Sequence, residues 1–215
     1  MTSDPRQRSR APLGDGGLPI EPDEATLIAA ARAGDRAAFA RLFRRHADTV
    51  RTHLTRLVGA VPEREDLLQG VFLSLHRGLA HYRGEGSLST FLHRVTVNTA
   101  TDHLRRRRSR GAVQAPLQDA DLPGAGSGGP HPEACVEARA DLLRLSRLLD
   151  RIAAKKRIAF VLVAVEGRSL AEAAELVGAR EQAVKQRVLK ARRELLALMA
   201  EEDQGAISTA RGSKP

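Results

Sequence analysis

Apolar side chains recur at steps of three and four residues along most of this chain, and this spacing constrains the fold more than any other feature. In the first half it gives the series Phe39, Leu42, Phe43, His46, Val50, Leu54, Leu57 and Val58. A second series lines residues 67–79, and a third runs from Val136 to Ile152. Steps of three and four place these side chains on one face of a helix. The sequence therefore predicts an all-α chain.

One short run tests that prediction. The segment "IAFVLVAV" (158–165) is apolar and β-branched, so by itself it resembles a buried strand. Helical patterns flank it on both sides, and the sequence offers no second strand to pair with it. We therefore expect a buried helix at 158–165.

Stretches rich in glycine, proline and serine divide the pattern into blocks. The predicted organisation is two small helical domains joined by a flexible linker. In chain order the parts are a disordered arm (1–22), a helical domain (23–110), the linker (111–132), a second helical domain (133–201) and a disordered tail (202–215).

The composition narrows the classes of partner. A net charge of +9 and a pI of about 10.8 favour a polyanion, with nucleic acid ahead of an acidic membrane surface. The single cysteine, Cys135, excludes an internal disulfide and fits a reducing, cytoplasmic setting. No apolar run reaches the ~20 residues that a membrane helix needs, so no membrane insertion is expected.

The second block carries the pattern of a helix-turn-helix. Ser169 precedes the apolar residues of a short helix, and Glu172 follows three positions later, which forms a capping box. Gly178 then supplies the turn into a longer basic helix. The C-terminal domain is therefore predicted to be a helix-turn-helix.

The longer helix has two distinct faces. Its apolar stripe is Val184, Val188, Ala191, Leu195 and Leu198, and at 100° per residue the opposite face carries Gln182, Lys185, Gln186, Leu189, Lys190 and Arg193. Glutamine pairs with adenine, lysine and arginine reach guanine or phosphate, and leucine contacts a thymine methyl. The alternative is a solvated basic face in an ordinary helical bundle.

A loop and a helix in the first block suggest a second DNA contact. "YRGEGSLS" (82–89) precedes a helix that ends in the arginine run 105–108, with Ser87 or Ser89 as its cap. Arg94, Asn98, Asp102 and Arg105 or Arg106 share one face of that helix, and we expect Asp102 to pair with Arg94 or Arg106. The alternative is that the arginines only cap the helix and keep it soluble.

These residues carry a family resemblance. The segment "DLLQGVFLSLHRGLAHYRGEGSLSTFLHRVTVNTATDHLRR" (66–106) resembles the second conserved region of bacterial sigma factors, closest to the small two-domain extracytoplasmic-function (ECF) group. The helix-turn-helix at 169–196 is similar to their fourth region, and "ARAGDRAAFARLFRRHADTV" (31–50) resembles the start of their first domain. The resemblance covers nearly everything outside the tails and the linker.

The resemblance implies a role for each segment. The helix that docks on the clamp helices of the polymerase β′ subunit matches Asp66, Leu67, Gln69, Val71 and Phe72. The residues matching −10 recognition and melting are Tyr82, Arg83, Gly84, Gly86, Ser87, Ser89, Arg94, Asn98, Arg105 and Arg106. The residues matching −35 recognition are Lys185, Gln186, Leu189 and Lys190, all on the face projected above.

The resemblance also implies partners and departures. The partners are core RNA polymerase, through its β′ clamp helices and β flap, promoter DNA and an anti-sigma factor, with the chain a monomer in the holoenzyme. The family usually has Glu where Gly70 stands and Trp where Phe91 stands. Lys155 and Lys156 replace part of the familiar Leu-Pro-Glu-Arg start and could alter flap docking.

Other functions find less support in the sequence. A stand-alone helix-turn-helix regulator would need a dimer interface, and a recombinase would need a nucleophile in a β-containing domain. The histidines lack the spacing and carboxylate partner of a metal site, and no phosphate-binding glycine loop is present. We therefore predict no enzyme activity, no cofactor and no metal.

Overall fold

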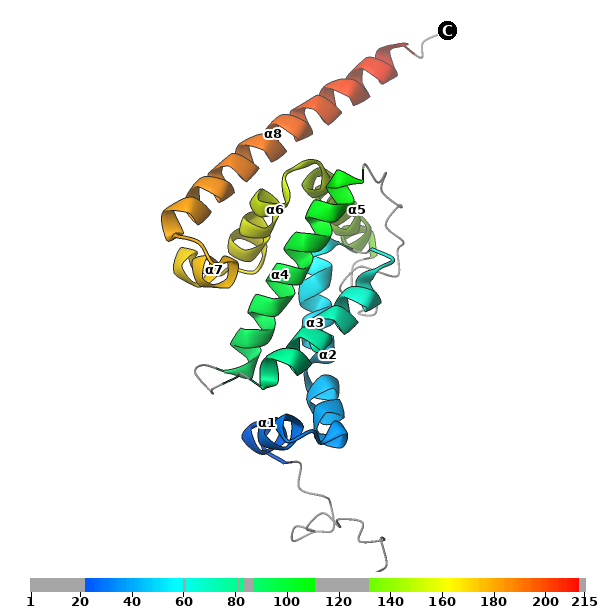
Figure 1. The fold of residues 1–215 in the computed structure, drawn as a ribbon. Helices are drawn as coiled ribbons and strands as arrows, with labels where there is room; N and C mark the ends of the chain where they lie inside the picture. The colour runs from blue at the N-terminus through cyan, green and yellow to red at the C-terminus, as the bar shows by residue number, and fades with distance from the viewer. Residues whose placement is uncertain (1–21, 60, 81, 83–86, 111–131, 213–215) are drawn as a thin grey trace, which may run out of the picture. The chain divides into compact units, whose positions relative to one another are not determined.

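The computed structural model describes residues 22–59, 61–80, 82, 87–110 and 132–212, of which the side chains are described except at 132–139 and 205–212. All regular structure within these ranges is helical, which confirms the predicted all-α class (Figure 1). The chain divides into two compact units, Met1–Arg45 and His46–Pro215. The described residues do not include the arm 1–21, the central part of the loop (83–86) or the linker 111–131.

The first unit is built around two helix starts with aspartate caps. The Asp23 carboxylate accepts a hydrogen bond from the Thr26 N–H at 3.0 Å and begins α1 (Glu24–Arg32). The Asp35 carboxylate accepts from Ala37 N–H at 2.8 Å at the start of α2 (Arg36–Val58). These side chains satisfy N–H groups that have no partner inside the helix.

Two further helices carry the candidate site of the N-terminal half. α3 (Arg64–Leu79) and α4 (Leu88–Ser109) pack against each other through apolar residues spaced three and four apart. Gly78 of α3 permits the closest contact, because a Cβ there would lie only 2.7 Å from Cζ of Phe91. The Phe91 ring thus rests directly on the α3 backbone.

The C-terminal half begins with α5 (Pro132–Arg151), α6 (Ala154–Phe160) and a π-helical turn, η2 (Val161–Val165). The run 158–165 is therefore helical, as the sequence predicts, but its burial is uneven: Ile158, Ala159, Val161 and Leu162 are buried, whereas Ala164 and Val165 are exposed. The π turn is a local widening, in which Glu166 N–H donates to the Val161 carbonyl at 2.9 Å.

The last two helices form the predicted helix-turn-helix, α7 (Leu170–Val177) and α8 (Glu181–Gly212). α8 continues to Gly212, through residues that the sequence predicts to be a disordered tail. Arg144 of α5 explains part of this, because it pairs with Glu202 at 3.1 Å and with Asp203 at 2.5 Å. Such long-range pairs have no signature in the local pattern.

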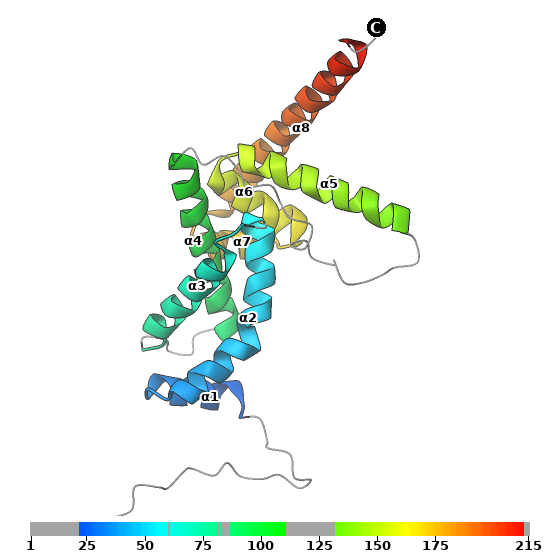
Figure 2. The same cartoon turned by 90° about the vertical axis from the view of Figure 1, so that its right-hand side faces the viewer.

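Within the second unit, α4 packs against both α6 and α7 (Figures 1 and 2). Helices from the two predicted domains are therefore in direct contact. None of the described helices is both long and apolar enough to cross a membrane.

Candidate nucleic-acid interface

Both ends of α7, the first helix of the helix-turn-helix, are capped. Ser169 Oγ accepts from Glu172 N–H at 3.2 Å, and Glu172 Oε2 accepts from Ser169 N–H at 2.8 Å, so the capping box is complete. These bonds hold the pKa of Glu172 below its ordinary value. Gly178 ends α7 at φ 59°, the left-handed conformation that glycine tolerates best. The geometry sets the direction in which α8 leaves the turn.

The two faces of α8 lie as projected. Val184, Val188, Ala191 and Leu195 are buried, and Leu198 is half-buried. The opposite face is exposed and consists of Gln182, Lys185, Gln186, Leu189, Lys190 and Arg193. Leu189 keeps 39% of its surface exposed, although it is apolar. This face offers amides, cations and one apolar group, and no element among the described residues covers it.

A lysine that the sequence singled out has a structural partner. Lys156 of α6 forms a short ion pair with Glu194 of α8, and both side chains are partly buried. It ties α6 to the long helix. Lys155 remains exposed. Of the two lysines, only Lys155 is therefore available for a docking contact.

The near end of α4 forms an aromatic corner. Ser87 caps the helix by accepting from Thr90 N–H at 3.1 Å, which selects Ser87 over Ser89. The rings of Tyr82 and Phe91 meet edge-on with centroids 6.0 Å apart, and the Arg94 guanidinium lies 5.8 Å from the Phe91 ring centre. A cation and two aromatic rings thus stand beside the loop. Arg83, Gly84 and Gly86 lie outside the described residues.

α4 presents polar groups outward along most of its length. Arg94, Asn98, Arg105 and Arg106 are all exposed on this helix. The partner expected for Asp102 is wrong, because Asp102 lies 3.6 Å from Arg105, three residues on. Arg94 is instead held over Phe91, which lies one turn before it. Two arginines of this face, Arg105 and Arg94, are therefore held by residues of the same helix, Asp102 and Phe91.

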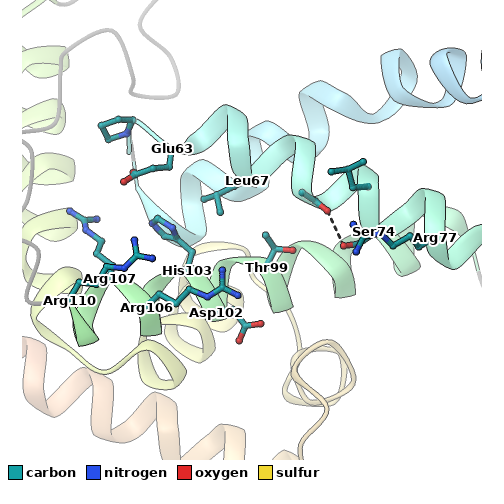
Figure 3. Close-up of a pocket in the computed structure, with 13 residues that line it drawn as sticks. Glu63, Leu67, Ser74, Arg77, Thr99, Asp102, His103, Arg106, Arg107 and Arg110 are labelled. Atoms are coloured by element: carbon teal, nitrogen blue, oxygen red, sulfur yellow. Dashed lines mark hydrogen bonds between the residues drawn. The ribbon is translucent and has the colours of Figure 1, made fainter.

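A groove of about 630 Å³ runs between α3 and α4 (Figure 3). Leu67, Gly70 and Leu73 contribute from α3. Arg107 and Arg110 lie toward one end, and Ser74 and Arg77 toward the other. Burial lowers the pKa of His103 in this groove, and the nearby Glu63 opposes that shift. The lining of the groove combines apolar residues of α3 with four arginines and the carboxylates of Glu63 and Asp102.

The residues predicted on α3 divide into two sets. Asp66 and Gln69 are exposed and Leu67 is half-buried, so these three can meet a partner. Val71 and Phe72 are buried, so they hold the helix in place and do not face outward. The sequence reasoning missed Leu73, which is 57% exposed and lines the groove between α3 and α4. The signal in the sequence that could have identified Leu73 is its position directly after the buried pair, Val71 and Phe72.

Among the described residues, no three histidine, cysteine, aspartate or glutamate side chains gather in a way that could hold a metal ion.

Comparisons with known proteins now identify the family. The model of sigma-70 region 2 matches residues 42–110, and the model of sigma-70 region 4 matches residues 142–195. The ECF RNA polymerase sigma factor SigM of Mycobacterium tuberculosis is 36% identical over 181 residues, covering 83% of this chain and 86% of that protein. The chain belongs to the ECF sigma factors of the sigma-70 family.

As an ECF sigma factor, the chain directs promoter-specific transcription initiation with RNA polymerase and is not an enzyme. Another relative is the RNA polymerase sigma factor CnrH of Cupriavidus metallidurans, 32% identical over 84% of this chain and 97% of that protein.

Solved structures share the fold of this sigma factor. One contains CnrH in complex with the cytosolic domain of CnrY, with a TM-score of 0.54, 24% identity and coverage of 82% of this chain and 96% of that one. Another contains the sigma factor RpoE with the anti-sigma factor NepR from Bartonella quintana, with a TM-score of 0.54, 21% identity and coverage of 75% and 96%.

Proposed function

We propose that this sigma factor reads the −35 element with α8 and opens the −10 element with the loop and face of α4. The observation that carries the proposal is the exposed face of α8, where amides and cations stand directly opposite a buried apolar stripe. The N-terminal half of such a helix enters a major groove. Gln182, Lys185 and Gln186 then face bases, while Lys190 and Arg193 face phosphates.

The −10 contact is assigned to the two ends of α4. Tyr82, Phe91 and Arg94 offer stacking and cation surfaces beside the loop that would accept an unstacked base. Extruding a paired base costs a few kcal/mol, so an offsetting contact is needed. Arg105 and Arg106, exposed at the far end, supply it by holding duplex phosphates.

Core polymerase is assigned to the exposed side of α3. Asp66, Gln69 and Leu73 are exposed on that side and offer a charge, an amide and an apolar group to the β′ clamp helices. Asp66→Ala is expected to weaken retention of core polymerase in a pull-down. Glu65→Ala is the matched control, because Glu65 already pairs with Arg51 at 3.0 Å. Equal retention of both variants would remove Asp66 from the docking face.

An anti-sigma factor is the further partner proposed. The similarity in fold to an RpoE that is bound to NepR supports this partner, as does the exposed docking side of α3. We assign the protein to the cytoplasm, where core polymerase and promoter DNA are found, and to a monomer within the holoenzyme.

A run-off transcription assay with purified core polymerase tests the whole proposal. Initiation at a specific promoter only when chain and core are both present is the expected result. Tight operator binding by a dimer of the chain without core would instead favour the stand-alone regulator. Transcript start mapping after overexpression then identifies the promoter elements.

A further inference from the structure

The groove between α3 and α4 is large enough to hold a small molecule (Figure 3). Its volume of about 630 Å³ lies within the range of known ligand sites, roughly 300–1,000 Å³. Its charged lining consists of four arginines and two carboxylates, namely Arg77, Arg106, Arg107, Arg110, Glu63 and Asp102. The groove therefore combines room for a ligand with an excess of positive charge.

Most arginines of this lining have no carboxylate partner. Among the described residues, no ion pair involves Arg77, Arg106 or Arg110. Asp102 lies 3.6 Å from Arg105, which does not line the groove. A guanidinium without an anionic neighbour forms strong, often bidentate hydrogen bonds with carboxylate or phosphate oxygens. The groove is therefore suited to an anion that supplies several such oxygens.

Arg107 is set back from the surface of the groove. Its side chain is only 19% exposed and lies 4.0 Å from Asp150 of α5. The backbone of a DNA duplex meets side chains that project outward, whereas a small anion can enter a groove and reach a recessed one. The position of Arg107 therefore favours a small ligand over a duplex.

His103 lines the groove beside these cations. Burial lowers the pKa of this histidine, and the carboxylate of Glu63 opposes that shift. The charges of Arg107, then Arg157 of α6 and then Arg106, lower the pKa further. The positive charges of several arginines thus act together at this end of the groove.

The α3 side of the groove is apolar around Gly70. Leu67 and Leu73 line the groove with it, and a Cβ at position 70 would meet no atom within 4 Å. Glycine inside a helix is less stable than alanine, so its presence calls for a reason. At Gly78 the reason is the Phe91 ring, 2.7 Å from where a Cβ would lie. No described contact gives such a reason at Gly70, where a flat ligand could lie against the bare helix.

We propose that this groove binds a nucleoside polyphosphate, with its phosphates beside Arg106, Arg107 and Arg110 and its base over Gly70. Unpaired guanidiniums match phosphate oxygens, and a bare backbone between leucines matches a planar base. The α4 side of the lining runs from Thr99 to Arg110, about 16 Å at about 1.5 Å per residue. This length accommodates a base, a sugar and a chain of phosphates in line.

The site overlaps the side of α3 that is assigned to core polymerase. Leu73 lines the groove and keeps 57% of its surface exposed, and it belongs to the proposed docking surface. A base over Gly70 covers Leu73, so ligand and core compete. This competition rests on the proposed function, whereas binding of the ligand to the free chain does not.

Calorimetry of the full chain without polymerase tests the site, with ATP, adenosine and inorganic pyrophosphate as probes. ATP should bind at one site and more tightly than pyrophosphate, and adenosine should bind least. Arg110→Gln should weaken ATP binding about tenfold, as expected for one lost charge-assisted bond. Arg108→Gln is the matched control, because Arg108 is exposed on the same helix but does not line the groove. Equal effects of the two variants would overturn the site.

A second variant separates the base from the phosphates. Gly70→Leu should keep the fold, because leucine favours a helix and the space above Gly70 is open. It should weaken ATP binding at least about tenfold by filling the place of the base, and it should leave pyrophosphate binding unchanged. ATP binding at the parent affinity by a folded Gly70→Leu chain overturns the placement of the base.

Proton NMR of the histidine rings locates the phosphates. A bound polyphosphate brings negative charge to the arginine end, so ATP should raise the pKa of His103, whose signal His103→Gln identifies. An equal rise at the exposed His76 indicates an adventitious ion only and overturns the proposal. The same holds if a short DNA duplex binds through Arg110 and ATP does not.

A pull-down with core polymerase separates this inference from the proposed function. Saturating ATP should lower retention of the parent chain by core, and Arg110→Gln should make retention less sensitive to ATP. An equal loss of retention in parent and variant assigns the effect to polymerase and overturns the competition, as does retention unaffected by ATP. Absence of core binding without ATP overturns the proposed function, while calorimetry of the free chain still decides whether the ligand site exists.

Discussion

The two DNA-facing helices, α8 and α4, differ in how far their exposed faces depend on contacts with other elements. The face of α8 is a set of exposed positions on one helix, aimed by the Ser169 capping box and the Gly178 turn. The face of α4 depends on other elements, since Phe91 rests on Gly78 of α3 and Arg107 reaches Asp150 of α5. Substitutions on α8 should therefore change recognition alone, whereas substitutions around α4 should affect recognition and packing together.

The largest expected effect is on α4. Replacing Arg105 and Arg106 with Ala should weaken promoter binding by the holoenzyme about 30-fold at low salt and reduce the salt slope by about 1.8, since each lost phosphate contact contributes about 0.9. A salt series with filter binding or fluorescence measures both values. Arg147→Ala, at an exposed position on α5, is the control. An unaltered slope would take both arginines off the phosphate contact list.

A smaller effect is expected from a single base-reading residue on α8. Gln186→Ala should lower discrimination at one −35 base pair by about 1 kcal/mol and leave the free energy of unfolding unchanged. Competition binding with promoters changed at each −35 position measures this. Gln204→Ala, exposed further along the same helix, should change neither quantity. If both variants keep full discrimination, the reading face has been placed incorrectly.

Two glycines should respond in opposite directions. Gly178→Ala should lower the free energy of unfolding by about 1–2 kcal/mol, because alanine is disfavoured at φ 59° although no atom lies within 4 Å of the new Cβ. Gly70→Ala should raise it by about 0.5–1 kcal/mol, because Gly70 lies inside α3 with the same open space. Urea denaturation followed by circular dichroism compares them. Equal signs would contradict the helix-turn geometry.

The smallest effect concerns pH. Burial, then the charges of His53 and Arg168, lowers the pKa of His93, and burial lowers the pKa of His103. As pH falls below the ordinary histidine value of about 6.5, the unfolded chain takes up protons that these histidines resist, so stability declines. His103→Gln should flatten this decline between about pH 7 and 5.5, measured by denaturation at each pH. His76→Gln, at an exposed position on α3, should preserve it.

The sequence predicted those features that depend on residues a few positions apart. The capping box, the left-handed glycine and the buried stripe of α8 each involve partners within one or two turns, and all are present. The features it missed join distant segments. Val71 and Phe72 were placed on a docking surface although they are buried, and Arg157 was not noticed at all. Asp102 is a local exception, because it was given the wrong partner although Arg105 lies only three residues on.

The physical reason is that helix spacing fixes a face but not what covers it. Residues 67–79 show an apolar pattern in which Leu73 and Phe72 look alike, and only the packing of α4 buries one and leaves the other exposed. In the same way, nothing in the sequence distinguishes Arg157 from the other cations of this basic chain. Its bond to the Leu57 carbonyl spans 100 positions and could come only from the structure.

The contact between Phe91 and Gly78 has an evolutionary consequence. A β-carbon at position 78 would lie only 2.7 Å from Cζ of Phe91, so the residues at 78 and 91 constrain each other in evolution. A bulkier ring at 91 is compatible with glycine at 78 only if α3 and α4 move apart. Any side chain at 78 would force the Phe91 ring to move. Among descendants of this gene, changes at the two sites should therefore arrive in pairs.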